Sequence, residues 1–327
     1  MAGKMSRRTF VRDSVLASAG TALTVGSAAA AAAGQSTPPA GNPAGSEEPL
    51  PMGKIGEMEI SRLLLGGNLL THYTHSRDLR YVYNLTAHYN TPEKILETLA
   101  LAEDHGINAL VIHTVDAALD VLREHRRRGG KMQWIICPTT PMEPGLLQYG
   151  EHVMRLIDDG TDSIYIWGVH TDAMTSPEGI ELLGRAVDMV KASGVSCGVA
   201  AHALRPIQEC EKNNVACDYY IKTLHHHNYP TAPQPGTTGD DYREFPGYWC
   251  GKPEETVEFM ETVEKPWIAF KVMAAGAIPP DDAFRYAVAS GADFILAGMF
   301  DFEIAPDAQI TRQVFADVQQ RPRPWRA

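Results

Sequence analysis

Histidines follow four of the short apolar runs that have the composition of buried strands. They are His113, His170, His202 and His225. Neutral imidazoles are preferred ligands of zinc and similar divalent ions, and a closed barrel gathers the ends of its strands in one ring. The sequence therefore predicts a divalent-metal site, zinc or similar, with these four histidines as ligands. For each histidine the alternative is a hydrogen-bonded side chain that holds no ligand.

Two further residues could perform proton transfer at such a site. Lys271 lies in an apolar run, with Ala269 and Met273 on the same face by strand alternation. A buried lysine is costly unless it is paired or functional, and a desolvated lysine can act as a base. Asp301 comes just after the last apolar run. We predict His170, Lys271 and Asp301 as catalytic residues, and the alternative for Lys271 is an ion pair with a carboxylate.

Two long connections carry side chains suited to a polar, ring-shaped ligand. Residues 67–90 include His72, His75 and Arg77, and residues 225–251 include Tyr248 and Trp249. Aromatic rings stack on the apolar face of a sugar, while polar groups hydrogen-bond to its hydroxyls. We predict that these five residues bind substrate. An ordinary surface lid would have a similar composition.

The elements that must position these residues alternate between β-branched runs and amphipathic helical segments. Eight such units can be counted, with strands near residues 62–65, 109–113, 133–137, 163–169, 196–200, 219–224, 267–272 and 294–297. This pattern predicts an α/β protein, a single (β/α)8 TIM barrel over residues 52–327. Residues 52–60 predict a short N-terminal hairpin that closes the barrel.

The N-terminus has the composition of an export signal. Ser6-Arg7-Arg8-Thr9-Phe10 precedes an uncharged, mildly apolar stretch that ends near Ala33. Residues 1–33 are therefore predicted to be a twin-arginine signal peptide, and the Pro- and Gly-rich residues 34–51 a disordered linker. We expect a periplasmic or extracellular protein without a membrane anchor after cleavage.

Net charge indicates the class of partner, and cysteine spacing indicates whether disulfides are expected. Removal of residues 1–33 takes away four basic residues and one acidic residue, and moves the formal net charge from −11 to −14. Such an acidic protein is not expected to bind nucleic acid, so the expected partner is a small-molecule substrate. The five cysteines form no CxxC pair, and we expect no obligatory disulfide, although Cys250 could pair or react.

Several segments together resemble the aldo-keto reductase superfamily. Residues 52–67 are similar to its opening hairpin and first strand. The interval from Asp162 to His170 matches its spacing between an aspartate and the active-site histidine. Gly198-Val199 stands where the family has Gly-Val-Ser-Asn, and residues 272–276 resemble its loop after strand 7. The resemblance covers nearly all of the chain after residue 51 and implies an aldo-keto-reductase-like barrel.

The resemblance also implies a nicotinamide cofactor and a catalytic tetrad, but of that tetrad only His170 is recovered. Cys137-Pro138 stands where the family has its lysine, and Ala200-Ala201 replace the pair that holds the carboxamide. Asp301 and Glu303 place acids where a 2′-phosphate would bind.

These departures favour a metal-assisted lyase, isomerase or hydrolase acting on a small polyhydroxylated or carbonyl substrate. An NAD(P)-dependent oxidoreductase is the alternative. A non-catalytic ligand-binding barrel is the second alternative.

Overall fold

The computed structural model describes residues 48–327, except residues 77, 240–241 and 244–246. The predicted signal peptide and most of the predicted linker lie outside the described residues. The end of that linker is described, and its Leu50 is buried against the position of Gly106. In the described ranges no helix is long and apolar enough to cross a membrane.

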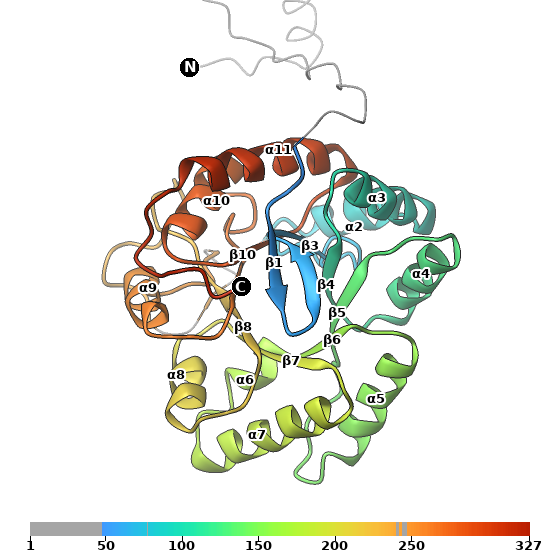
Figure 1. Cartoon of the computed structure of the whole chain (residues 1–327). Helices are drawn as coiled ribbons and strands as arrows, with labels where there is room; N and C mark the ends of the chain where they lie inside the picture. The colour runs from blue at the N-terminus through green and yellow to red at the C-terminus, as the bar shows by residue number, and fades with distance from the viewer. Residues whose placement is uncertain (1–47, 77, 240–241, 244–246) are drawn as a thin grey trace, which may run out of the picture. The chain divides into compact units, whose positions relative to one another are not determined.

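Eight parallel strands form a closed barrel, which confirms the predicted fold (Figure 1). Each strand pairs with the next along the chain, and the last strand pairs with the first. The strands are β3 (Leu63–Gly66), β4 (Ala109–His113), β5 (Gln133–Cys137), β6 (Ser163–Ile166), β7 (Ser196–Ala201), β8 (Tyr219–Thr223), β9 (Trp267–Phe270) and β10 (Phe294–Ala297).

Helices surround this barrel, and several begin where the sequence predicts. Pro92, Pro177, Pro253 and Pro280 each open a helix, because a proline at the first helical position lacks only an N–H that would have no intrahelical partner. The helices are α2 (Tyr81–Tyr89), α3 (Pro92–Asp104), α4 (Asp116–Arg127), α5 (Leu147–Asp158), α6 (Gly168–Thr171), α7 (Pro177–Ala192), α8 (Arg205–Lys212), α9 (Pro253–Glu261), α10 (Pro280–Ala289) and α11 (Asp301–Asp317).

The predicted N-terminal hairpin is confirmed and covers the amino-terminal end of the barrel. Strands β1 (Met52–Ile55) and β2 (Met58–Ser61) pair antiparallel. Ile55 and Ile60 are fully buried in the same apolar cluster as Phe294 from inside the barrel. A Cβ at Gly53 would lie 2.8 Å from the Phe294 ring, so only glycine lets the hairpin approach this closely.

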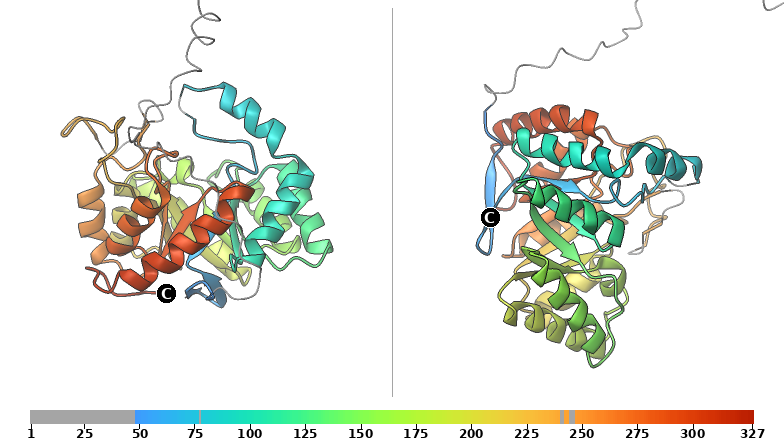
Figure 2. Two further views of the ribbon diagram at one scale, coloured as in Figure 1. Left: turned by 90° about the horizontal axis from the view of Figure 1, so that it is seen from above. Right: turned by 90° about the vertical axis from the view of Figure 1, so that its right-hand side faces the viewer.

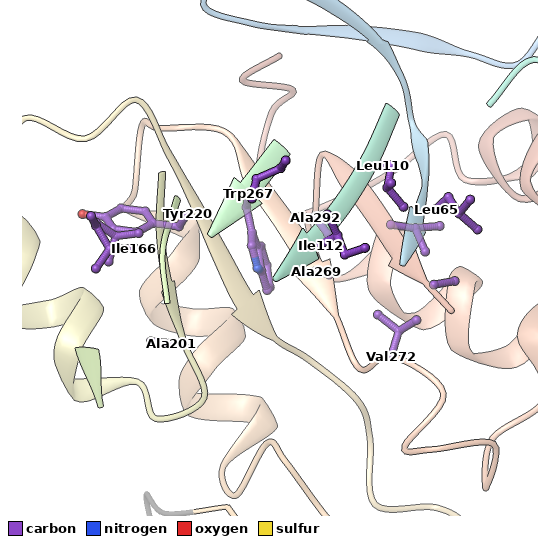
Figure 3. Packing of buried hydrophobic residues seen from close by; sticks show 14 of the residues in the cluster. Leu65, Leu110, Ile112, Ile166, Ala201, Tyr220, Trp267, Ala269, Val272 and Ala292 are labelled. Carbon is purple, nitrogen blue, oxygen red and sulfur yellow. The ribbon is translucent and has the colours of Figure 1, made fainter. Parts of the chain in front are cut away.

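Side chains alternate between two apolar layers. Tyr220, Trp267 and Ala269 belong to the layer between the strands and the helices, part of which is drawn in Figure 3. Ile221 and Ile268 belong to the cluster inside the barrel. Because both faces of the strands are buried, the strands are predominantly apolar, as the sequence pattern predicts.

Side chains just before alternate strands connect neighbouring strands at the amino-terminal end. In each case a side-chain oxygen accepts a backbone N–H at 2.7–2.9 Å, from a residue within two positions of the start of the preceding barrel strand. The four pairs are Asn108 with Ser61, Asp162 with Trp134, Asp218 with Cys197, and Asp293 with Trp267. We call these bonds the strand clasps.

The C-terminal segment after α11 also packs against this end. Arg323 is completely buried, and its guanidinium pairs with Asp293 at 2.5 Å. It also donates to the carbonyl oxygens of Val263, Gly291 and Lys265. The buried cation is thus paired and fully hydrogen-bonded, which is the condition under which proteins tolerate one.

Two connections at the opposite, carboxyl-terminal end are long, as predicted. The connection after β3 runs from Gly67 to Asn90 and includes α2. The connection after β8 runs from Leu224 to Lys252, and its described part includes an isolated antiparallel bridge between Arg243 and Tyr248. These two connections supply residues to the candidate site.

Candidate active site

Lys271 lies at the carboxyl-terminal end of the barrel, surrounded by aromatic rings. Its Nζ is 5.3 Å from the ring centroid of Trp249, 5.7 Å from that of Tyr242 and 5.8 Å from that of Phe270. These distances suit cation–π attraction. A charged ammonium is therefore held at the mouth of the barrel.

Side-chain alternation predicts Lys271 on the inward face of a strand, and that reason is wrong. Ala269, predicted to share the inward face with Lys271, belongs to the outer layer. Strand β9 ends at Phe270, and Lys271 has a left-handed backbone conformation with a φ of 56°. The turn breaks the alternation, so that the lysine side chain reaches the mouth although Ala269 points outward.

A histidine–aspartate pair lies beside this lysine. The Asp172 carboxylate accepts the Nδ1–H of His202 at 2.7 Å, and it also accepts the backbone N–H groups of His202 and Ala203. Three hydrogen bonds fix the carboxylate, which in turn leaves the lone pair of a neutral His202 on Nε2. The Tyr242 ring packs against the imidazole, with 4.3 Å between ring centroids and 33° between the ring planes.

Burial and the Lys271 charge lower the pKa of His202 to about 4, and the opposing effect of Asp172 is smaller. At neutral pH this imidazole is therefore uncharged and able to accept a proton on Nε2.

Asp172 was missed by sequence reasoning. The predicted strand over residues 163–169 ends early, at Ile166, and residues 168–171 form the one-turn helix α6. That turn carries Asp172 to the mouth of the barrel, whereas a longer strand would have placed it elsewhere. The available signal was an aspartate two residues after His170, close to a predicted strand end.

His75 joins the same group of side chains from the long connection after β3. Its ring makes an edge contact with Trp249 at 5.6 Å, so the two long connections meet here. Burial and then the nearby charges of Lys271, His202 and His113 lower the pKa of His75 to about 2. His75, His202 and Lys271 thus meet around the rings of Trp249 and Tyr242.

His170 lies on α6, next to this group. Its ring makes an edge contact with Trp167 at 5.2 Å, and burial lowers its pKa. Its Nδ1 is buried without a hydrogen-bond partner among the described residues.

His225 has a structural role that the predicted metal site did not anticipate. Its Nε2 accepts the backbone N–H groups of Trp249 and Cys250, and its Nδ1 lies 3.0 Å from the carbonyl oxygen of His226. Both nitrogens are occupied, and burial lowers the pKa of the ring to about 3. His225 fixes the loop that presents Trp249.

The remaining predicted residues are dispersed. The Nε2 of His72 lies 2.9 Å from the carbonyl oxygen of Asn90, and thereby connects the two ends of its loop. Tyr248 is buried, and Arg77 lies outside the described residues. The Asp301 carboxylate accepts hydrogen bonds from Tyr89 and Lys94, which outweigh the effect of burial and lower its pKa. Cys250 is buried, and all five cysteines are free thiols.

The predicted metal site is wrong. Within the described ranges, no group of three or more His, Cys, Asp or Glu side chains has the arrangement to hold a metal ion. Backbone groups occupy both nitrogens of His225, and His202, whose Nε2 stays open, is not joined by two further His, Cys, Asp or Glu side chains in a ligand arrangement within the described ranges. The four histidines share strand ends but do not converge on one point.

Two features near the mouth could receive a nucleotide. In the loop after β9, Lys271, Ala274, Ala275 and Gly276 all have positive φ angles. A left-handed alanine costs about 1 kcal/mol, and such strain collects at functional sites. At the start of α11, Phe300 and Phe302 stack at 5.4 Å, and Phe302 is 64% exposed beside Asp301.

No protein-family model matches the sequence, and no curated protein matches it either. Solved structures do match its fold. Aldo-keto reductase AKR11C1 from Bacillus halodurans, in its holo form, is 12% identical, with a TM-score of 0.53, and the match covers 83% of this chain and 97% of that one. A variant of Gox0644 in complex with NADPH is 11% identical, with a TM-score of 0.53, and the match covers 86% of this chain and 97% of that one.

These neighbours correct the preference for a metal over a nicotinamide cofactor. One is an aldo-keto reductase in its holo form and the other holds NADPH, and the described residues include no group of side chains that could hold a metal ion. The metal-assisted lyase, isomerase or hydrolase is therefore withdrawn. At identities this low the likeness concerns the fold, and the chain has an aldo-keto-reductase-like (β/α)8 barrel.

Proposed function

We propose that this protein is an NAD-dependent oxidoreductase that oxidises a secondary alcohol of a small polyhydroxylated compound. The observation that carries the proposal is the Asp172–His202 pair at the mouth of the barrel, where enzymes of this fold place their sites. Oxidation of an alcohol needs a base for the hydroxyl proton. A neutral, oriented imidazole is such a base.

His202 would take the place of the tyrosine that the reductase family uses for proton transfer. Its Nε2 accepts the proton from the substrate hydroxyl, and the Asp172 carboxylate stabilises the imidazolium that forms. Because the pKa of free His202 is about 4, the base form predominates at neutral pH. This favours the direction of alcohol oxidation.

Lys271 supplies the electrostatic part of the reaction. Its ammonium is close enough to lower the pKa of both His202 and His75. A positive charge at this position stabilises the negative charge that develops on the substrate oxygen as its proton leaves. The aromatic rings around Lys271 exclude water and strengthen this effect.

The chain fits NAD better than NADP. When bound, the cofactor supplies the hydride-accepting nicotinamide. Residues 274–276 form a turn with positive φ angles, and backbone N–H groups in such turns can receive a phosphate. Asp301 can accept a hydrogen bond from a ribose 2′-hydroxyl, and Phe302 offers an exposed ring for the adenine. Lys94 faces the two acids Glu97 and Asp301, an excess of negative charge that opposes a 2′-phosphate.

The carboxamide end differs from the family pattern. Ala200 and Ala201 are buried and offer no side-chain donor to the nicotinamide. Cofactor affinity would therefore depend on the phosphate and adenosine ends. Tyr242 is half-buried and supports a ring-shaped substrate, because aromatic faces pack on the C–H faces of sugars. Trp249, predicted to bind substrate, is buried and packs beside Lys271 instead.

Calorimetric titration with NAD⁺, NADH and NADP⁺ tests the cofactor, and a panel of sugars and polyols followed by NADH absorbance tests the reaction. We expect NAD⁺ to bind at least about tenfold more tightly than NADP⁺, which corresponds to about 1.4 kcal/mol. His202→Gln should bind NAD⁺ normally but lose activity by about 100-fold or more. His88→Gln, an exposed histidine on α2, is the control. Absence of dinucleotide binding would refute the proposal.

A further inference from the structure

Helix α2 presents an apolar stripe to solvent. Tyr81, Leu85 and Tyr89 are 66%, 59% and 38% exposed. They are spaced four residues apart, so they lie along one face of the helix. We call Tyr81, Leu85 and Tyr89 the α2 stripe. The helix stands at the outer edge of the described part of the molecule (Figure 2).

Helix α2 lacks the features that would stabilise it alone. It has nine residues, all described, of which only Thr86 is buried. Its N-terminus has neither a side-chain cap nor an acidic residue in the first turn. Isolated helices shorter than about 12 residues are marginal in water, and most helical stability comes from packing of an apolar face. A partner for the stripe would supply that packing.

The order of side chains in the stripe matches a second copy of itself. The sequence Tyr81-Leu85-Tyr89 reads the same in both directions. A two-fold axis through Leu85 would pair two α2 helices antiparallel, with Tyr81 against the partner subunit's Tyr89 and the reverse. Such reciprocal contact is the condition for a symmetric dimer interface.

Charge also favours self-association at this helix. The chain carries a formal net charge of −11, so two copies repel each other over most of their surfaces. Helix α2, with the sequence YVYNLTAHY, contains no Asp, Glu, Lys or Arg. It attracts neither a basic nor an acidic partner, and it is a segment on which two acidic copies can meet without bringing like charges together.

We propose that the α2 stripe is the centre of a homodimer interface. Exposed aromatic side chains at the centre of an interface, with a more polar rim, are typical of such contacts. The proposal rests on α2 and not on the proposed oxidoreductase activity, although Tyr89 also donates a hydrogen bond to Asp301 and makes an edge contact with Phe302, which are assigned to the adenosine end of NAD.

Sedimentation analysis of the purified protein, without cofactor, tests the proposal. We expect a dimer at micromolar concentration, and Leu85→Glu should weaken it by at least about 100-fold, because each axis contact would then bury two carboxylates. Leu147→Glu is the matched control, since Leu147 on α5 is 70% exposed. A monomeric wild-type protein at about 100 μM, or a Leu85→Glu variant as dimeric as the wild type, overturns the proposal.

Crosslinking gives a second readout that does not depend on affinity. All five native cysteines are buried, so Leu85→Cys introduces an exposed thiol. On a two-fold axis this thiol meets its own copy, and mild oxidation should give a covalent dimer that dissociates in reductant. Leu147→Cys should remain monomeric under the same oxidation. Equal crosslinking of both variants would mean that the contact is random.

Discussion

Histidines of this chain differ in role because their nitrogens meet different groups. Asp172 binds Nδ1 of His202, whereas Nε2 of His225 accepts two backbone N–H groups. Both side chains are buried at the end of a strand, so residue type and spacing could not distinguish them. The groups that distinguish the two histidines are distant in sequence. Asp172 lies 30 positions from His202, and Trp249 and Cys250 lie 24 and 25 positions from His225.

Substitution of Asp172 by Asn should reveal its positioning role. The amide cannot stabilise an imidazolium, so we expect turnover on the alcohol substrate to fall by about 100-fold or more. Since Asp172 raises the pKa of His202, the acid limb of the rate profile should also move to lower pH. The measurement is the pH dependence of kcat/KM.

Asp282→Asn is the matched control for that experiment. Asp282 also lies beside a histidine, with 3.3 Å between its carboxylate and Nε2 of His226. Its loss should leave the rate profile unchanged. Equal effects of the two substitutions would exclude a specific role for Asp172.

Buried neutral imidazoles should make the protein sensitive to acid. The folded pKa of His225 is about 3, while the unfolded value is about 6.5. The contribution is complete above pH 6.5 and is lost as the pH falls toward 3, because only the unfolded chain then binds the proton. Urea unfolding at pH 7 and pH 5 should show that His225→Gln loses about 2 kcal/mol less than the wild type over this interval. The exposed His88→Gln should not alter the loss.

At the scale of elements, the loop after β9 contains local backbone strain. Ala275 is exposed, with a φ of 55°. Ala275→Gly should stabilise the fold by roughly 0.5–1 kcal/mol, because glycine adopts this conformation without a Cβ clash. Ala283→Gly, inside α10, should instead destabilise it by about 1 kcal/mol. Thermal unfolding of both variants is the measurement, and a loss of stability in Ala275→Gly would argue against strain in this loop.

Elements were largely predictable, and their ends were not. Apolar runs and helix-opening prolines located the barrel strands and several helices, because these signals are local. The predicted strand near residues 267–272 ends at Phe270, and the predicted strand near residues 163–169 ends at Ile166. These short differences decide where Lys271 and Asp172 point. A candidate site built from strand ends therefore depends on the least predictable positions.

At the scale of the whole molecule, stability depends on contacts that close the amino-terminal end. Arg323 and Asp293 form an ion pair in which both side chains are fully buried. Arg323→Ala should cost about 3–5 kcal/mol, because it leaves the Asp293 charge buried with fewer partners. Arg326→Ala, which removes a pair with the exposed Glu264, should cost less than about 1 kcal/mol. Chemical denaturation compares the two, and similar costs would contradict the burial argument.

At the scale of the whole chain, we propose export through the twin-arginine pathway, on the basis of the sequence of residues 1–33. The twin-arginine signal predicted over residues 1–33 lies outside the described residues. Passage through that pathway would suit a protein that acquires its nucleotide before it leaves the cytoplasm. Mature protein recovered from the periplasm should then release NAD on acid treatment, in an amount measurable by enzymatic cycling. Nucleotide-free protein that binds NAD⁺ only weakly would contradict this route.

The strand clasps divide the barrel into four quarters of two strands each. Every clasp joins residues 21 to 47 positions apart, within one quarter. New chain ends placed between quarters, for example between β4 and β5, would leave all four clasps within continuous segments. Circular permutation there should be tolerated better than between β3 and β4, which separates Asn108 from Ser61. The same arrangement allows each quarter to exist as a transferable module, exchangeable with the corresponding pair of strands in another barrel.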